Sequence, residues 1–339
     1  MGRGTDGERG AGAGADPAED RDRCFGEDGM CMADGLDTAW PAGPKAGPGA
    51  PATSGQQAAP PLDPVERFFR RRGDVILDLY FQTCRRRGGA ATLLRKRTIV
   101  EAKPETGQLP VRTLTFASPN DGASLGLRLE MADITKVLVK DRAGQAFDLK
   151  SYSMSAERAG EFDLTVKMYP GGMGSGYLDR VQVGEAIDIY AMAERYNAVR
   201  HAGTHVGVLA FGVGITEALP VARGELERPV HAGGPRQVHL LWSARTFGDM
   251  FWHDEFAALE RAHPGRFTVT RILSREDREG CLKGRIDAEV LADVFGGWHE
   301  AGAEPRFHAV GTCLMMRQAK YNLVCVGFEW PKSALLTRP

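Results

Sequence analysis

A glycine-rich turn at residues 212–216 is the strongest candidate for chemistry in this sequence. Gly212 and Gly214 end an apolar run, residues 205–211, that has the length of a buried strand, and helical spacing of apolar residues follows from 215 to about 226. A glycine-rich turn before a helix lets backbone N–H groups approach a phosphate, and the helix N-terminus adds partial positive charge. The motif, which includes Thr216, therefore predicts a phosphate site, although a strand–helix turn that binds nothing would use the same residues.

A second glycine-rich stretch lies earlier in the chain, at Gly171-Gly172-Met173-Gly174-Ser175-Gly176. Its glycines can form a backbone nest suited to a pyrophosphate. We expect a short helix that begins near Tyr177 and Leu178, so that its N-terminus lies at this loop. The alternative is a flexible hairpin loop without a ligand.

Two further groups of residues could contact a planar cofactor ring. Lys150-Ser151-Tyr152-Ser153 ends a strand-like run, where Lys150 could contact a phosphate, Tyr152 could stack on a ring and Ser153 could hydrogen-bond a ring edge. Gly311 and Thr312 follow a later predicted strand and could border a crevice near a reacting ring. An ordinary strand end and an ordinary strand–helix turn are the alternatives.

The elements that position these residues change in character along the chain. Short alternating strands with turn signals between them, from residue 98 to about 190, predict a small antiparallel barrel. We expect strands at 111–116, 125–130, 134–139, 162–168 and 187–190.

After Gly203 the pattern alternates between strand and helix, which predicts a parallel sheet covered on both faces. Ligands bind beyond the carboxyl ends of the strands in such sheets. We expect strands at 205–211, 237–243, 267–273, 307–310 and 321–326, and helices at 215–226, 247–262, 287–295 and 313–320.

Length and composition set the domain organisation. The chain of 339 residues has room for two ordinary domains and an additional segment, and its net charge of −1 argues against a general nucleic-acid binder. Residues 1–62 are rich in Gly, Ala, Pro and Asp, so we expect them to be disordered. A basic amphipathic helix is expected within 63–94, ending at Gly88-Gly89, before a barrel domain at 95–200 and a sheet domain at 201–339.

The basic segment at 63–97 bears on cellular location. It could contact an anionic membrane surface, although we favour a helix that packs on the main body with a solvated basic rim. The sequence has no apolar run long enough to span a membrane and no secretory signal. Six scattered cysteines show no metal-ligand spacing, so we expect no metal site and a reducing, cytoplasmic environment, with a peripheral membrane location as the alternative.

Two phosphate loops in two domains imply two nucleotide cofactors, and the order of the motifs resembles the ferredoxin–NADP reductase superfamily. The similarity is greatest to its cytochrome b5 reductase and phenol-hydroxylase-reductase-like branches, and it covers about 95–339. Lys150 to Ser153 is similar to the family's Arg-x-Tyr-Ser/Thr. Residues 172–178 are similar to the family's Gly-Lys-Met-Ser before Tyr-Leu, and residues 212–217 are similar to its Gly-Thr-Gly-Ile-Thr-Pro. Residues 240–246 and 252–256 resemble the strand and helix that contact the adenine ribose in the family. Residues 310–315 are similar to its Cys-Gly-Pro/Thr-x-x-Met.

This resemblance implies a flavin-binding β-barrel followed by a doubly wound NAD(P)-binding domain. NAD(P)H would deliver hydride to FAD, which would pass single electrons to a haem or iron–sulfur protein. Tyr152 would stack on the flavin, Ser153 would bond near its reactive nitrogen, and Thr216 and Gly311 would frame the nicotinamide. FAD would be held by Lys150, Tyr152, Ser153, Gly172, Met173, Gly174 and Ser175, and NAD(P)H by Gly212, Gly214, Thr216, Arg245, Gly311 and Thr312.

The nicotinamide coenzyme and the departures from the family pattern leave alternatives open. Arg245 could meet the 2′-phosphate of NADPH, but we favour NADH. Lys150 replaces an arginine, and Val213 and Glu217 replace a threonine and a proline, which puts an acid near the expected pyrophosphate site. The alternatives are the reductase component of an oxygenase or desaturase system and a regulatory nucleotide-binding module without turnover.

Overall fold

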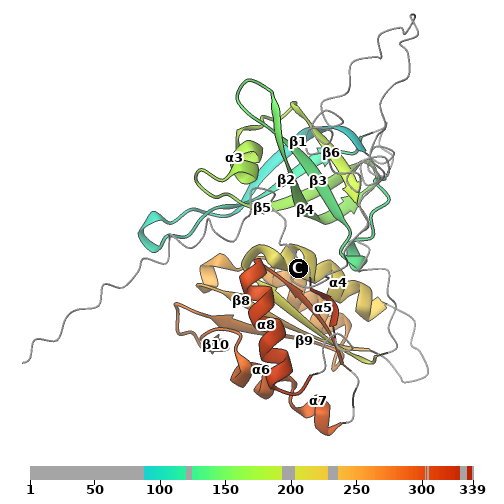
Figure 1. Ribbon diagram of the computed structural model, residues 1–339, viewed down its shortest axis with the longest axis vertical. Coiled ribbons are helices and arrows are strands. Elements are labelled where there is room, and N and C mark those ends of the chain that lie inside the picture. Colours follow the sequence, from blue (N-terminus) through green and yellow to red (C-terminus); the bar gives the residue numbers. More distant parts are fainter. Residues whose placement is uncertain are drawn as a thin grey trace, which may run out of the picture.

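A computed structural model describes residues 88–119, 124–192, 203–227, 236–301, 303, 305–328 and 334–337. The expected disordered segment at 1–62 and most of the expected basic helix lie outside the described residues. Within them the chain forms an antiparallel barrel and a parallel sheet covered by helices, which lie one above the other in Figure 1. The predicted fold class is therefore confirmed.

The barrel is closed, in the strand order β1-β2-β5-β4-β3-β6, and every described pairing in it is antiparallel. Its apolar side chains point inward, and Phe116 stacks on Phe162 across two strands with ring centroids 5.5 Å apart. Short helix α3 (Met173–Arg180) follows the fifth strand and buries Tyr177 and Leu178 against this core. The strands are β1 (Gly88–Val100), β2 (Val111–Ala117), β3 (Ile134–Lys140), β4 (Ala146–Arg158), β5 (Glu161–Lys167) and β6 (Ala186–Met192).

Two expectations for the barrel are wrong in detail. Gly88 and Gly89 begin β1 and pair with β6, and the expected boundary at 94/95 falls inside this strand. The alternating leucines at 125–129 form no strand: residues 124–128 lack a ladder, and Leu129–Met131 is a 3₁₀ turn. Leu125 and Leu127 are nevertheless buried in the barrel core, so the alternation correctly indicated burial.

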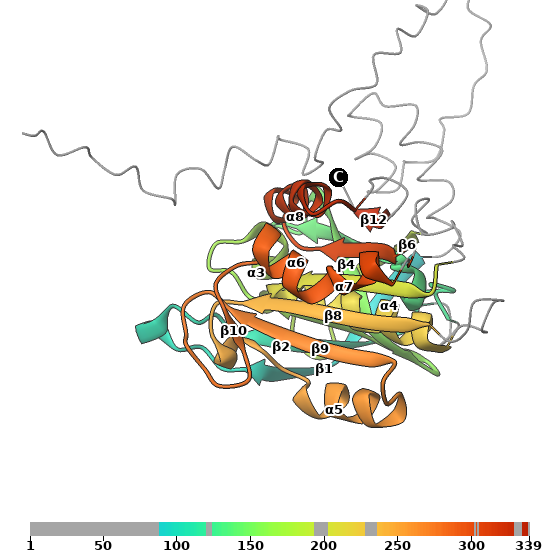
Figure 2. The ribbon, with the colours of Figure 1, turned by 90° about the horizontal axis from the view of Figure 1, so that it is seen from below.

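The second domain is a six-stranded sheet in the order β10-β9-β8-β7-β11-β12, with every described pair parallel. Apolar side chains form a core on each face, one beneath α4 and α5 and the other beneath α6 and α8, and Figure 2 shows α5 and α8 on opposite sides of the sheet. The strands are β7 (His205–Phe211), β8 (Gln237–Ala244), β9 (Phe267–Leu273), β10 (Leu282–Lys283), β11 (Pro305–Val310) and β12 (Ala334–Thr337); the helices are α4 (Ile215–Glu227), α5 (His253–Ala262), α6 (Ala288–Phe295), α7 (Gly297–Glu300) and α8 (Cys313–Cys325).

Two sheet-domain elements differ from expectation. The helix expected at 247–262 is a 3₁₀ turn, Phe247–Asp249, followed by α5, because Trp252 has a φ of +61° that interrupts the helix. The strand expected at 321–326 is the continuation of α8, which runs to Cys325 instead of ending near 320. Within the described residues, no helix is long and apolar enough to cross a membrane.

The two domains share apolar and polar contacts. Val100 and Val111 of the barrel belong to the apolar core beneath α4. Lys167 at the end of β5 pairs with Asp249 of the sheet domain, with the two charged atoms 3.0 Å apart and both side chains at most 10% exposed. The barrel and the sheet are therefore held in a fixed relation around their common boundary.

A half-buried histidine gives the fold a specific pH dependence. His239 on β8 contacts Thr270 Oγ1 at 2.8 Å, and burial lowers its pKa from 6.5 to about 4. Between pH 4 and pH 6.5, His239 binds a proton in the unfolded chain but not in the folded protein. The contribution of His239 to the free energy of unfolding is therefore complete above pH 6.5 and decreases toward pH 4. We expect His239 to contribute about 2 kcal/mol to the loss of unfolding free energy between pH 7.5 and pH 5. Denaturant titrations at both pH values should show a smaller loss for His239→Asn, and an equal loss in both proteins would contradict the assignment.

Candidate functional site

The glycine turn after β7 is shaped by close backbone contacts. Gly212 has a φ of +56°, and its carbonyl oxygen accepts a hydrogen bond from Trp242 Nε1 at 2.9 Å. A Cβ on Gly214 would lie 2.5 Å from the carbonyl oxygen of Val310, at the end of the neighbouring strand β11. Thr216 is buried in the first turn of α4 and donates to the carbonyl oxygen of Val213. The turn thus presents backbone at the start of α4, as a phosphate site requires.

The turn after β11 lies directly beside it. β7 and β11 are parallel neighbours, so their carboxyl ends meet at one edge of the sheet. A Cβ on Gly311 would lie 2.8 Å from Cβ of Phe211, the last residue of β7. Thr312 caps α8 by accepting a hydrogen bond from the N–H of Met315. The structure therefore brings Gly212, Gly214, Thr216, Gly311 and Thr312 together, at the edge where parallel sheets bind ligands.

In the barrel, the second glycine stretch is the start of a helix and not a loop before one. α3 begins at Met173, four residues before the expected start near Tyr177, and Gly172 is its N-cap, without a side-chain hydrogen bond to the helix. Ser175 Oγ accepts a hydrogen bond from the N–H of Tyr169 and so ties the helix to the end of β5. The free N–H groups of this helix start suit an anion such as a pyrophosphate.

Gly174 brings this helix start against β4. A Cβ on Gly174 would lie 2.4 Å from Tyr152 Oη and 3.0 Å from Lys150 Cγ, so the glycine allows the closest contact between α3 and β4. Lys150 Nζ pairs with Asp148 Oδ2 at 2.6 Å. Burial, and secondarily the charge of Asp148, raises the pKa of Tyr152, which keeps its hydroxyl neutral. A cation, an aromatic ring and a helix N-terminus thus converge in the barrel.

A polar chain joins this barrel cluster to the sheet domain. Ser153 Oγ donates a hydrogen bond of 2.5 Å to Glu217 Oε2 on α4. The other oxygen, Glu217 Oε1, lies 3.2 Å from His308 Nε2 on β11, and both of these side chains are at most 2% exposed. Glu217 was expected near a pyrophosphate; the structure directs its carboxylate to Ser153 instead. His308 went unnoticed in the sequence, where a single polar residue in a buried strand was the available signal.

Arg245 was expected to bind NAD(P)H. It follows β8, is half-buried, and its carbonyl oxygen accepts from the N–H of Arg275 at 2.8 Å. Nearby, the Arg278 guanidinium lies 3.8 Å from the centre of the Phe247 ring, which also stacks on His253. These aromatic and basic side chains offer a surface for an adenosine, and the sequence analysis did not identify Phe247 or Arg278.

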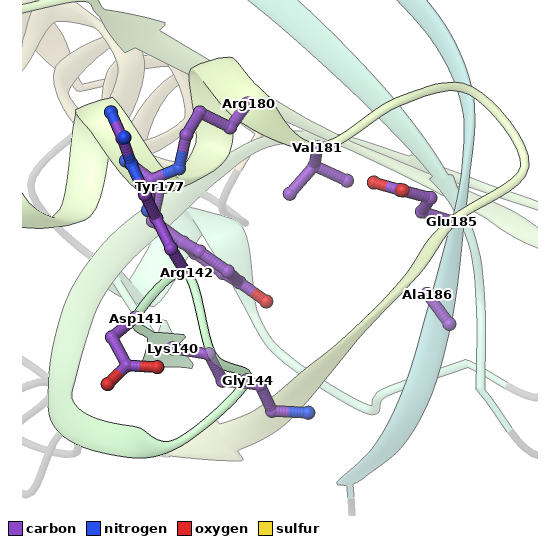
Figure 3. Close-up of a pocket in the computed structure, with 9 residues that line it drawn as sticks. All are labelled: Lys140, Asp141, Arg142, Gly144, Tyr177, Arg180, Val181, Glu185 and Ala186. Atoms are coloured by element: carbon purple, nitrogen blue, oxygen red, sulfur yellow. The ribbon is translucent and has the colours of Figure 1, made fainter.

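A cavity of about 630 Å³ lies between the β3–β4 turn, α3 and the start of β6. Figure 3 shows Arg142, Arg180 and Tyr177 on the same side of it. Lys140, which also lines it, pairs with Asp188 at 2.6 Å. The sequence analysis did not find this cavity, because its walls come from three separate segments.

Two family models match the chain in the same order as its two domains. An oxidoreductase FAD-binding domain matches residues 100–194, and an oxidoreductase NAD-binding domain matches residues 208–320. The first match contains Lys150, Tyr152, Ser153 and α3, and the second contains the glycine turn and Gly311. The predicted cofactors, FAD and NAD(P)H, are therefore confirmed at the level of the domains.

Curated relatives and solved structures agree with these matches. The chain is 28% identical to NADH-cytochrome b5 reductase 1 of Dictyostelium discoideum over 163 residues, which are 48% of this chain and 55% of the relative. It is 29% identical to NADH-cytochrome b5 reductase 2 of Neurospora crassa over 186 residues, 54% of this chain and 53% of the relative. The matches thus span about half of each relative. The cytochrome b5 reductase domain of Ulva prolifera nitrate reductase shares the fold, with a TM-score of 0.57 and 20% identity over 73% of this chain and 96% of that domain.

Proposed function

The chain belongs to the ferredoxin–NADP reductase superfamily of FAD- and NAD-binding oxidoreductases, in its cytochrome b5 reductase-like branch, and from this premise we propose a specific activity. We infer that it transfers hydride from NAD(P)H to FAD and then passes electrons singly to a protein acceptor. The observation that carries the proposal is the link between Ser153 and Glu217. This 2.5 Å hydrogen bond joins Ser153, beside Lys150 and Tyr152 in the barrel, to Glu217, which directly follows the glycine turn at 212–216 in the sheet domain.

The barrel residues fit FAD. The N–H groups at the start of α3 and the Lys150 ammonium suit its pyrophosphate, and the half-buried Tyr152 ring suits stacking on the flavin. Because Gly174 has no side chain, the backbone of α3 is accessible beside Lys150 and Tyr152, both of which a Cβ at this position would contact. When bound, FAD would supply the redox chemistry, while these side chains orient it and exclude water.

The sheet-domain turns fit the nicotinamide coenzyme. We propose that Gly212 and Gly214 hold its pyrophosphate and that Thr216, Gly311 and Thr312 border the nicotinamide. Arg245 and the Phe247–Arg278 pair would contact the adenosine. We propose NADH as the preferred coenzyme, because the relatives reported above are named NADH-cytochrome b5 reductases.

We propose a haem protein as the electron acceptor, on the same similarity to cytochrome b5 reductases. An iron–sulfur partner, in an oxygenase or desaturase system, is the alternative; reduction of cytochrome b5 compared with a ferredoxin in the presence of NADH separates the two. We further propose a cytoplasmic protein, with a role of residues 63–97 in contact with a membrane surface as the alternative. Co-sedimentation with anionic liposomes that is unaffected by replacing Arg85, Arg86 and Arg87 with glutamine would contradict that role.

An absorbance experiment tests the proposed function directly. The purified full chain should show flavin absorbance, and anaerobic NADH should bleach it faster than an equal concentration of NADPH. Faster bleaching by NADPH would reverse only the coenzyme preference. A protein that takes up FAD but is bleached by neither coenzyme, or that takes up no FAD, would leave the regulatory module as the better explanation.

A further inference from the structure

The hydroxyl of Ser153 is committed to a partner in the other domain. Its hydrogen is donated to Glu217 Oε2 at 2.5 Å, a short distance typical of a hydroxyl bound to a carboxylate. Glu217 is the third residue of α4, where the helix N-terminus favours the ionised carboxylate. His308 Nε2 lies 3.2 Å from the other carboxylate oxygen, Glu217 Oε1. The family pattern has a proline at position 217, so this carboxylate is a departure from that pattern.

A serine hydroxyl has one hydrogen and two lone pairs. While the hydrogen bonds to Glu217, the Ser153 oxygen can offer only lone pairs to any other group. The ring nitrogen N5 of oxidised flavin is an acceptor, whereas in reduced flavin it carries a hydrogen and is a donor. A serine held in this way can therefore bond the reduced ring but not the oxidised one.

We propose that Glu217 is a positioning residue that holds the Ser153 hydrogen away from the flavin, so that Ser153 accepts a hydrogen bond from reduced FAD. This inference rests on the proposed function, because it requires FAD beside Ser153. Its consequence is a preference: Ser153 increases the affinity for reduced FAD relative to oxidised FAD. Without Glu217, the hydroxyl hydrogen is released, and Ser153 can donate to oxidised FAD or accept from reduced FAD, so its preference for the reduced form is lost.

A double-mutant cycle tests the proposal. The midpoint potential of bound FAD, compared with free FAD, gives the ratio of the affinities for the reduced and oxidised forms. In the natural chain, Ser153→Ala should lower this ratio about threefold to tenfold, a fall of about 14 to 30 mV for a two-electron couple. In a Glu217→Ala background, Ser153→Ala should change the ratio by less than about twofold, because the free hydroxyl can bond either form. The cycle cancels the direct effect of the Glu217 charge on the flavin, because that charge is absent from both members of the second pair.

The size of the Ser153→Ala effect in the two backgrounds decides the outcome. An equal fall of the ratio in both backgrounds would overturn the proposal, and failure of the natural chain to bind FAD would overturn the proposed function instead. Glu227→Ala, which removes an exposed acid from the same helix, is the control and should leave the Ser153→Ala effect unchanged. Glu217→Pro, with the family's residue in the first helical turn, provides a second background if Glu217→Ala does not fold.

A second readout requires no flavin. The unfolding free energies of the four FAD-free proteins should be non-additive, because Ser153 and Glu217 are direct partners. Additive values would show that the hydroxyl is not committed to Glu217, which would also overturn the proposal.

Discussion

Gly174→Ala is expected to weaken FAD binding about tenfold to hundredfold while the chain remains folded. The new methyl group would lie 2.4 Å from Tyr152 Oη and 3.0 Å from Lys150 Cγ, so α3 must move away from β4 or both side chains must shift. Tyr152 packs against the barrel core and cannot rotate freely. Such overpacking costs about 1–3 kcal/mol, and every 1.4 kcal/mol corresponds to a tenfold change in affinity. Flavin fluorescence quenching during titration of the FAD-free protein measures the loss.

Gly176→Ala is the matched control for this prediction. Gly176 lies in the same helix, and its added Cβ would meet only Arg180 Nη1, at 3.9 Å. Alanine is a better helix former than glycine, so this variant should be more stable by up to about 1 kcal/mol and should bind FAD normally. Equal FAD affinity in the two variants would show that the contact of α3 with Lys150 and Tyr152 does not shape the flavin site.

The sheet domain was the most predictable part of the chain, because strand and helix periods alternate there without ambiguity. The error at 321–326 has an identifiable cause: an apolar run of this length before a glycine fits a buried strand or a buried helix equally well. The fold selects the helix, since Met316, Ala319 and Leu323 fall on one helical face and are all buried. Periodicity over the longer range 313–325 contains this information, whereas the six-residue window does not.

In the barrel, the local sequence pattern predicts which residues are buried but not which residues form hydrogen-bonded strand pairs. Leu125 and Leu127 alternate as a half-buried strand does and are indeed buried, but no strand in the described part of the chain pairs with them. At Gly88-Gly89 the local glycine signal favoured a helix end, whereas pairing with Tyr190 and Ile189 on β6 makes these residues part of the closed barrel. Both outcomes depend on which distant segment is available as a partner, which local sequence does not state.

The candidate site was predictable as residues but not as contacts. Glycines, Lys150, Tyr152 and Ser153 are recognisable by type and order. The contact of Gly174 with β4 depends on where α3 begins, and the bond from Ser153 to Glu217 depends on how two domains meet. Glu217 appeared only as a departure from a family pattern, and its partner His308 had no motif around it. Long-range geometry therefore supplies the contacts of the site that local sequence does not indicate.

Gly214→Ala is expected to lower kcat/KM for NAD(P)H about hundredfold without loss of FAD. The added Cβ would lie 2.5 Å from the Val310 carbonyl oxygen and 3.0 Å from its carbonyl carbon. These are backbone atoms of β11, so no side-chain rotation relieves the overlap, and the turns after β7 and β11 must separate. A displacement of about 1 Å between reacting groups can cost about hundredfold in rate. Anaerobic stopped-flow reduction of the FAD-loaded protein measures the change.

The location of the overlap makes this prediction selective. FAD content should stay normal, because the barrel contacts at Gly174 are untouched, while unfolding free energy should fall by about 1–3 kcal/mol. Gly297→Ala is the control in the same domain, since no atom lies within 4 Å of its added Cβ. If Gly214→Ala reduced FAD as fast as Gly297→Ala, the turn at 212–216 would not hold the coenzyme. If it lost FAD as well, the flavin site would depend on the junction between β7 and β11, and the division of roles between the two domains would be wrong.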